Sequence, residues 1–262
     1  EQLCDGFCAL EQIKTIAVVG NTTMCHIFLG QDTSGLAGSP FRPAYRGIYR
    51  CKGSDIDLQE MKDTDVIVPA GIDAHVGADA VSMICALQLP ETKETILAVD
   101  IGTNAEIALS CKGEISVCSA PAGPAFEGAQ ISQGMRGEPG AIAGMHIARQ
   151  SGNILLEVIP DDRRNVYPVR GICGSGLIDS IASLRQSGIL QPDGYLLCDP
   201  EEADRLGIPG YLRERITEKG FLVYLDPGGQ QVCLTQKDIR QFQLAKAAVQ
   251  AGIRMLLEPK GL

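Results

Sequence analysis

One cluster of residues that could do chemistry is a turn between two apolar segments, which reads AVDIGTN over residues 98–104. Asp100 closes the first segment, and a carboxylate there could hold Mg²⁺ through water. Gly102 lets the backbone approach an anion closely, while Thr103 and Asn104 add side-chain donors. The spacing fits a phosphate-binding turn and an ordinary hairpin turn equally well.

A second cluster, GICGSG over residues 171–176, leads into a helical pattern. Gly174, Ser175 and Gly176 stand where that helix would begin, and a helix N-terminus behind small residues attracts anions. The G-x-x-G-x-G spacing is not the dinucleotide fingerprint, and no P-loop lysine follows. Close packing of a helix on a sheet also selects glycine, so both interpretations stay open.

Glu127 is the only charged residue in the small, apolar run 119–132. A lone carboxylate there could face a cleft and bind ribose, a metal or a catalytic water. It equally fits a charge at the start of a helix, where it would complement the helix dipole.

The fourth cluster follows an apolar run and reads GNTTMCH over residues 20–26. Thr22 or Thr23, next to Asn21, is expected to cap a helix. His26 could be a base or a ligand, but a single histidine on an amphipathic helix is more often a hydrogen-bonded structural residue, and we interpret it so.

Charge and cysteine content narrow the classes of function. Lys and Arg number 23 and Asp and Glu 32, which gives a net charge of 23 − 32 = −9 and argues against nucleic-acid binding. The ten cysteines are scattered without any C-x-x-C, and only Cys4 and Cys8 lie close together. We interpret them as free thiols in a reducing cytoplasm, or as those of an anaerobe's oxygen-sensitive protein. The sequence itself contains no pattern of a secretory signal, and its apolar runs are expected to be too short to span a membrane.

The elements that must position these clusters follow from hydrophobic periodicity. Short apolar runs predict strands over 15–19, 65–69, 95–100, 105–110, 114–119, 153–159, 221–225 and 231–234. Helical spacing predicts helices over 22–29, 73–89, 126–134, 174–186 and from 235 onward. The rest is expected to be loop, chiefly 31–62, the Gly/Ala/Pro-rich stretch 120–144 and the turn-rich stretch 192–220. Hairpins mixed with helical crossovers predict a layered α/β fold, and Thr235 with Asp238 makes a capping pattern for the last helix.

Taken together, the clusters resemble the C-terminal, actin-like ATPase region of the reductive activators of corrinoid enzymes, a family of the ASKHA superfamily. The matching stretches are VVGNTTMCHIFLG, GLAGSPFRPAYRG, VPAGIDAHVGADAVSMI, ILAVDIGTNAEIAL, SAPAGPAFEGAQISQGMR, GICGSGLIDSIA and LTQKDIRQFQLAKAAVQAGI. The resemblance implies an α/β, actin-like (ribonuclease H-like) ASKHA ATPase fold, with a mixed sheet flanked by helices and an incomplete first lobe. It implies that residues 1–94 are the remainder of the first lobe with a connecting segment. Residues 95–262 would form the second lobe, with an insertion near 192–234.

The same resemblance assigns roles to residues. Asp100 and Glu127 would be catalytic, with Asp100 also holding Mg²⁺. The nucleotide would be bound by Gly102, Thr103, Asn104, Gly174, Ser175 and Gly176, and by the connecting segment Asn21, Thr22 and Thr23.

The function implied by the resemblance is ATP-dependent reduction of an inactive cob(II)alamin protein to cob(I)alamin. ATP and Mg²⁺ would be the cofactors, and a corrinoid protein or corrinoid-dependent methyltransferase the partner. A homodimer is compatible with the resemblance. Neither a first phosphate loop nor a clustered set of ferredoxin-type cysteines is present, so we expect a fragment that is inactive alone, with the iron–sulfur cluster on a domain missing from it. The alternatives are a docking fragment that hydrolyses nothing and an ASKHA activator of a radical dehydratase.

Overall fold

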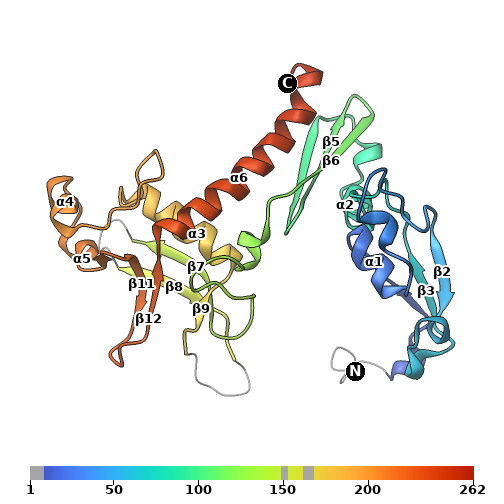
Figure 1. The fold of residues 1–262 in the computed structure, drawn as a ribbon, viewed down its shortest axis with the longest axis horizontal. Coiled ribbons are helices and arrows are strands. Elements are labelled where there is room, and N and C mark those ends of the chain that lie inside the picture. Colours follow the sequence, from blue (N-terminus) through green and yellow to red (C-terminus); the bar gives the residue numbers. More distant parts are fainter. Residues whose placement is uncertain (1–8, 149–152, 162–167) are drawn as a thin grey trace. The chain divides into compact units, whose positions relative to one another are not determined.

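The computed structural model describes residues 9–148, 153–161 and 168–262. The chain divides into two compact units, coloured by sequence in Figure 1. Unit 1 comprises Glu1–Asp100, Glu106–Ala120 and Gly252–Leu262, and unit 2 comprises Ile101–Ala105 and Pro121–Ala251. The fold is mixed α/β, with four small three-stranded sheets among the described residues.

The first sheet of unit 1 has the order β1-β3-β2, formed by β1 (Thr15–Ala17), β3 (Asp65–Val68) and β2 (Tyr49–Lys52). β1 runs parallel to β3, and β2 runs antiparallel to it. The predicted strands at 15–19 and 65–69 are therefore confirmed, the first in shortened form. β2 was expected to be loop, because it lies in a glycine- and proline-rich stretch with little alternation.

Helix α1 (Thr22–Phe28) packs on this sheet, as Figure 1 shows, and shares a core with Val68. The expected cap is wrong by one residue. The side chain of Asn21, not that of Thr22 or Thr23, accepts a hydrogen bond from the backbone N–H of Met24 at 2.9 Å. The extended conformation of Asn21 places its short amide where a cap must stand.

Helix α2 (Ala78–Ala86) is shorter than the predicted helix over 73–89. The N–H groups of Ile72 and Asp73 both donate to the carbonyl of Val76, which makes a tight turn instead of a first helical turn. Gly77 then passes so close to α1 that an added Cβ would lie 2.7 Å from the backbone nitrogen of Thr22. This close approach to a distant segment overrides the local helical spacing.

The second sheet of unit 1 has the order β4-β5-β6, from β4 (Ile96–Ile101), β5 (Ala105–Cys111) and β6 (Glu114–Ala120). All three strands were predicted, because each is a compact apolar run between turn residues. β5 is buried along its whole length. Gly252, in the last helix, packs here, and the Cys118 thiol donates to its carbonyl at 3.5 Å.

Unit 2 contains a sheet of order β8-β7-β9, from β7 (Ala141–Ile147), β8 (Ile154–Val158) and β9 (Gly171–Ile172). Helix α3 (Gly174–Gln186) lies across this sheet in Figure 1, with the bounds that the sequence predicts. β7 is the central strand, yet no strand is predicted there, because its first residues continue the Gly/Ala/Pro-rich stretch 120–144.

The next elements of unit 2 lie within the stretch 192–234 that is expected to be an insertion, and its first part, expected to be loop, contains two short helices. Short helices α4 (Pro200–Arg205) and α5 (Gly210–Arg213) are followed by a sheet of β10 (Ile216–Thr217), β11 (Gly220–Leu225) and β12 (Gln231–Leu234). The last two strands confirm the prediction.

Helix α6 (Gln236–Leu257) begins with the predicted capping pattern. The backbone N–H of Thr235 donates to Asp238 at 2.8 Å, and the N–H of Asp238 donates back to the Thr235 hydroxyl at 3.3 Å. Short 3₁₀ turns complete the described chain at Leu10–Gln12, Ser34–Leu36, Gly53–Ile56, Gln59–Met61, Leu89–Glu91, Pro124–Glu127 and Glu258–Lys260.

The helix predicted over 126–134 is not formed. A 3₁₀ turn occupies Pro124–Glu127, and Gly128 follows it with φ of 78°, a left-handed conformation that ends the turn. In the part of the chain that the structure describes, no helix is long and apolar enough to cross a membrane.

Candidate functional site

The turn between β4 and β5 is held by three hydrogen bonds, two between backbone groups and one from a backbone N–H to a side chain. Gly102 N–H donates to the carbonyl of Asn104 at 3.0 Å, and Gly123 N–H donates to the carbonyl of Thr103 at 2.8 Å. The third is donated by the N–H of Thr103 to Oε1 of Glu127 at 2.9 Å. The turn thus already binds one negatively charged oxygen, supplied by the protein itself.

Glu127 is the last residue of its 3₁₀ turn, and its carboxylate contacts a segment 24 positions away. Because no α-helix starts at Glu127, the interpretation of its charge as complementing a helix dipole is wrong, and its role in binding at a cleft stays a prediction. The turn is anchored because Gly128 packs tightly on Met135, where an added Cβ would lie 2.3 Å from the carbonyl oxygen.

A hollow of about 330 Å³ opens beside Glu127 and is bordered by Phe126, Met135, Arg136, Gly137 and Gly174. Arg136 is exposed and contributes the cation of this hollow. No side chain caps the N-terminus of α3, which begins at Gly174. A cation beside an uncapped helix N-terminus favours an anionic ligand.

Arg136 is a residue that sequence reasoning missed. It ends the stretch SAPAGPAFEGAQISQGMR, and a cation so near a lone carboxylate was the signal that could have found it.

Both glycines at the start of α3 have a packing reason. An added Cβ on Gly174 would lie 1.7 Å from the carbonyl oxygen of Phe126, and one on Gly176 would lie 2.1 Å from that of Ile142. Ser175 donates its hydroxyl to the carbonyl of Ala143 at 2.8 Å. The close-packing interpretation therefore accounts for the cluster, while Gly174 also borders the hollow.

Unit 1 contains a group of carboxylates that the sequence did not reveal. Burial raises the pKa of Glu106 above its usual range, and the negative charges of Asp79 and Asp100 raise it further, although a hydrogen bond from Ser119 at 3.1 Å partly offsets this. Burial also raises the pKa of Asp79, with a smaller contribution from Asp100. The negative charge of Asp100, the predicted Mg²⁺ ligand, is thus felt by both of these carboxyl groups. No group of three metal-ligating side chains was found among the residues that the structure describes.

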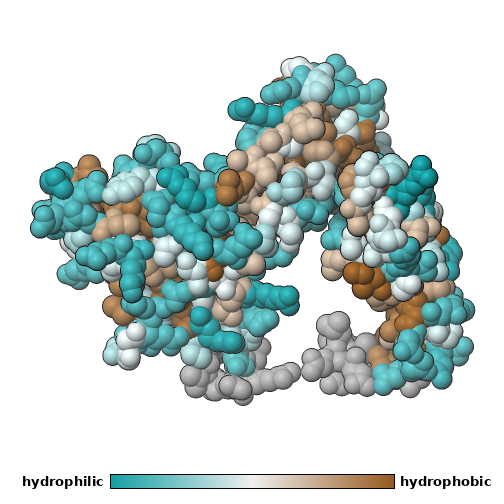
Figure 2. Space-filling view, in the orientation of Figure 1, coloured by the Kyte–Doolittle hydropathy of each residue, from teal (hydrophilic) through white to brown (hydrophobic). Residues whose placement is uncertain are grey.

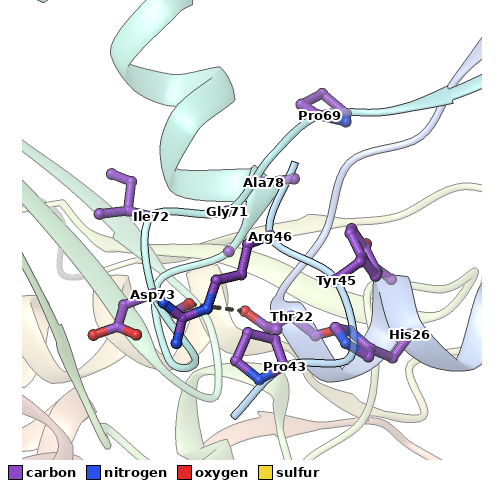
Figure 3. Close-up of a pocket in the computed structure, with 12 residues that line it drawn as sticks. Thr22, His26, Pro43, Tyr45, Arg46, Pro69, Gly71, Ile72, Asp73 and Ala78 are labelled. Atoms are coloured by element: carbon purple, nitrogen blue, oxygen red, sulfur yellow. Dashed lines mark hydrogen bonds between the residues drawn. The ribbon is translucent and has the colours of Figure 1, made fainter. Parts of the chain in front are cut away.

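Of the three predicted residues at the start of α1, only Thr22 borders a second, smaller hollow, which lies in unit 1 (Figure 3). Thr22 donates its hydroxyl to the carbonyl of Asp73 at 3.3 Å, whereas Thr23 is exposed. His26 is buried, its Nδ1 donating to the carbonyl of Thr22 at 2.7 Å and its Nε2 accepting from the N–H of Ala44 at 3.0 Å. The structural interpretation of His26 is confirmed.

The predicted site residues are therefore distributed over both units. Those of unit 1 are Asn21, Thr22, Thr23 and Asp100, and those of unit 2 are Gly102, Thr103, Asn104, Glu127, Gly174, Ser175 and Gly176. Within unit 2, the structure brings together Thr103, Glu127 and Gly174.

The eight cysteines of the described residues are all free thiols, as predicted, and Cys4 and Cys8 lie outside that part of the chain. Burial raises the pKa of the thiols of Cys25, Cys118 and Cys233, which disfavours reactive thiolates there.

Comparison with known proteins defines the class. Residues 94–262 match the family described as the C-terminal domain of RACo, the ASKHA domain, and residues 2–92 match the RACo middle region. The fold is thus that of an ASKHA-domain protein, as the sequence led us to expect. The chain belongs to the RACo family of reductive activators.

Individual relatives agree with this assignment. A solved structure titled reductive activator for corrinoid, iron–sulfur protein superposes with a TM-score of 0.81 at 32% identity, over 100% of this chain and 40% of that one. The corrinoid activation enzyme RamQ of Eubacterium limosum is 34% identical over 93% of this chain and 40% of its own length. A Co(II) methylated amine-specific corrinoid protein reductase of Methanosarcina barkeri is 30% identical over 73% of this chain and 41% of its own. The chain thus spans about 40% of the length of these relatives.

Proposed function

We propose that this chain is the ATP-dependent part of a reductive activator that drives reduction of cob(II)alamin in a corrinoid protein to cob(I)alamin. The observation that carries the nucleotide half of the proposal is the bond from Thr103 N–H to the carboxylate of Glu127. It marks a backbone donor already arranged for an anionic oxygen, beside Arg136 and the uncapped start of α3. The names of the relatives support the corrinoid half.

The residues of unit 2 fit the phosphates of a nucleotide. Thr103 N–H would donate to a phosphate oxygen in place of Glu127, and Asn104 would add a side-chain donor. Gly102 brings the backbone close to this position, since an added Cβ would lie 3.6 Å from Oε1 of Glu127. Arg136 would neutralise phosphate charge. ASKHA domains generally bind ATP, which supports this assignment.

Glu127 has a second role in the proposal. Once its carboxylate leaves Thr103, it becomes free to accept a proton from a water at the hollow, as a general base does. Asp100 would hold Mg²⁺ through water, because Mg²⁺ keeps several waters and uses few carboxylates. Gly174, Ser175 and Gly176 would form the wall near the nucleotide, and Asn21, Thr22 and Thr23 the connecting segment.

The chemistry to be driven is the addition of one electron to Co(II), which gives Co(I). In the proposal the electron comes from an iron–sulfur cluster on a domain outside this chain. ATP supplies binding and hydrolysis energy, and the protein uses it by favouring the conformation of the complex in which cobalt accepts the electron more readily. Such a shift is limited to the difference in nucleotide affinity between the two conformations.

The experiment is an anaerobic assay that follows cob(II)alamin reduction by absorbance. It contains a corrinoid protein, a low-potential reductant and the longest polypeptide containing this sequence that can be expressed. We expect reduction to depend on ATP and to be abolished by Asp100→Ala, with Asp63→Ala, an exposed aspartate of unit 1, as the charge-matched control. Equal rates with and without ATP, or an unaffected Asp100→Ala variant, would overturn the proposal.

A further inference from the structure

The hollow beside α1 is small and lies wholly within unit 1. It holds about 70 Å³ between the first turns of α1, residues 43–46 and residues 69–78. Sites for cofactors and drug-sized ligands measure about 300–1,000 Å³. This hollow therefore has the size of a single side-chain group.

The walls of the hollow are fixed before any ligand arrives. The two hydrogen bonds of His26 tie the 43–46 segment to α1, and its ring stacks on Tyr45 with centroids 4.7 Å apart. The bond from Thr22 to the carbonyl of Asp73 ties the third segment to the same helix. A preformed site binds without the entropy cost of ordering its walls.

Arg46 supplies the charge that a ligand would meet. Its side chain reaches across the hollow toward Thr22 and Asp73 in Figure 3, and none of the salt bridges among the described residues involves it. The other charged group at the hollow, Asp73, accepts a hydrogen bond at Oδ1 from the N–H of Ala74 at 2.8 Å. A planar guanidinium matches a carboxylate with two parallel hydrogen bonds.

The ligand chemistry follows from the number of cations. The lining carries one cation, Arg46, and one carboxylate, Asp73, whose Oδ1 already accepts the hydrogen bond from Ala74, so it suits a single negative charge better than a phosphate dianion. The apolar walls include Tyr45, Pro43 and Ile72, which suit the methylenes of a side chain.

The surface around the hollow is basic within an acidic chain. Residues 33–54 contain four basic residues and no acidic one, so the remaining chain carries −9 − 4 = −13. Lys52 pairs with Asp65 at 2.7 Å. Three exposed arginines remain, Arg42, Arg46 and Arg50, and we call them the arginine surface. Neighbouring members are four residues apart, so their Cα atoms lie at most about 14 Å from each other.

Exposed apolar side chains accompany these charges. Ile48 is 59% exposed and Ile72 is 50% exposed. On the outer face of α1, Met24 and Ile27 are 62% and 67% exposed, and Figure 2 shows hydrophobic residues gathered over this part of unit 1. Arginine, tyrosine and methionine beside apolar groups are the composition of protein–protein interfaces.

We infer that the arginine surface is a docking site for an acidic segment of a partner protein, with one Asp or Glu carboxylate of that segment seated on Arg46 in the hollow. Charge complementarity selects the occupant. Binding of the acidic segment requires no nucleotide. The inference rests on the proposed function only where it takes the partner to be a corrinoid protein.

The test is fluorescence anisotropy of a labelled oligo-glutamate peptide titrated with this chain, without nucleotide, at low and high salt. We expect binding that weakens with salt and that falls by about tenfold or more in Arg46→Glu, because a charge-assisted pair is replaced by repulsion. Arg185→Glu, an exposed arginine of unit 2, makes the same charge change and is expected to retain binding. Arg46 is exposed and unpaired, so both variants are expected to keep the wild-type unfolding midpoint.

Three results would overturn the inference. They are an absence of peptide binding by the wild-type chain, an equal loss in both arginine variants, and tighter binding of a single-stranded oligonucleotide of equal charge. Displacement of the peptide by acetate and phosphate at equal concentrations would instead indicate a free-anion site and would also contradict docking. Because no nucleotide is present, failure here is distinct from failure of ATP-dependent reduction.

Discussion

Glu127 competes with any phosphate for the N–H of Thr103, since one backbone donor serves both. Glu127→Gln keeps an acceptor for that donor, so the turn is preserved, but it removes the negative charge. We therefore expect the variant to bind ATP more tightly, by about fivefold, and to hydrolyse it more slowly. Calorimetric titration beside Glu138→Gln, an exposed control in unit 2, measures the first effect.

Weaker nucleotide binding by Glu127→Gln would show that the carboxylate is a ligand of the nucleotide's metal ion instead of a competitor of phosphate. An equal gain in ATP affinity for Glu138→Gln would show that the effect comes from the change in net charge and not from the Thr103 N–H.

Glu106 offers a pH-dependent test of the interaction among the three carboxylates of unit 1, Glu106, Asp79 and Asp100. Its pKa is raised in the folded protein by burial first and by Asp79 next, so the folded state binds this proton more tightly than the unfolded state does. Its contribution to stability is full below the unfolded pKa and is lost as pH rises through the raised, folded pKa. Glu106→Gln removes this loss and is expected to raise the free energy of unfolding at neutral pH.

Denaturant unfolding at several pH values measures the Glu106 effect, and the gain should shrink as pH falls. Glu114→Gln is the control, because Glu114 is exposed and the bond from Lys260 lowers its pKa, so it titrates with the opposite sign. A gain for Glu106→Gln that is the same at every pH would contradict the assigned cause.

At the scale of elements, the start of α6 depends on Asp238. This fully buried carboxylate accepts from Ser132 N–H at 2.7 Å and from both the N–H and the hydroxyl of Thr235 at 2.8 Å. Asp238→Ala leaves these donors unpaired and is expected to cost about 2–4 kcal/mol of unfolding free energy. Lys237→Ala, exposed in the same turn, should change it by less than about 0.5 kcal/mol.

Urea unfolding followed by circular dichroism measures the difference between the Asp238 and Lys237 variants. Equal midpoints for the two would show that α6 is held by its apolar face alone.

Elements with a strong local pattern could be predicted from the sequence. The strands of the 95–120 region and α3 appear where apolar spacing places them, because turn residues bound each of them. The misses share a physical cause. β7 begins in a glycine- and alanine-rich stretch, so its strand character comes from pairing with its neighbours β8 and β9, and α2 starts late because Gly77 must pass α1 closely.

The candidate site divides in the same way. The motif around Asp100 and the lone Glu127 could be found from residue types, because polar groups in apolar runs stand out. The bond between Glu127 and Thr103, the position of Arg136 and the charge around Glu106 depend on contacts between distant segments. Spacing along one chain carries no such information.

At the scale of the whole molecule, two units carry different parts of the account. Unit 2 holds the turn with its anion-binding donor, and unit 1 holds Asp100, the carboxylate group and the arginine surface. Because the chain spans about 40% of its relatives, the domain roles proposed for 1–94 and 95–262 concern only part of such an activator. That the chain forms a homodimer stays a prediction, and analytical ultracentrifugation would test it by measuring the molecular mass in solution.

The most direct test of the central claim is calorimetric titration of this chain with ATP, with and without Mg²⁺. The account predicts measurable heat of binding that strengthens with Mg²⁺, and loss of that Mg²⁺ effect in Asp100→Ala. A silent titration under both conditions, or an Asp100→Ala variant that responds to Mg²⁺ as the wild type does, would contradict it and would favour a docking fragment that hydrolyses nothing.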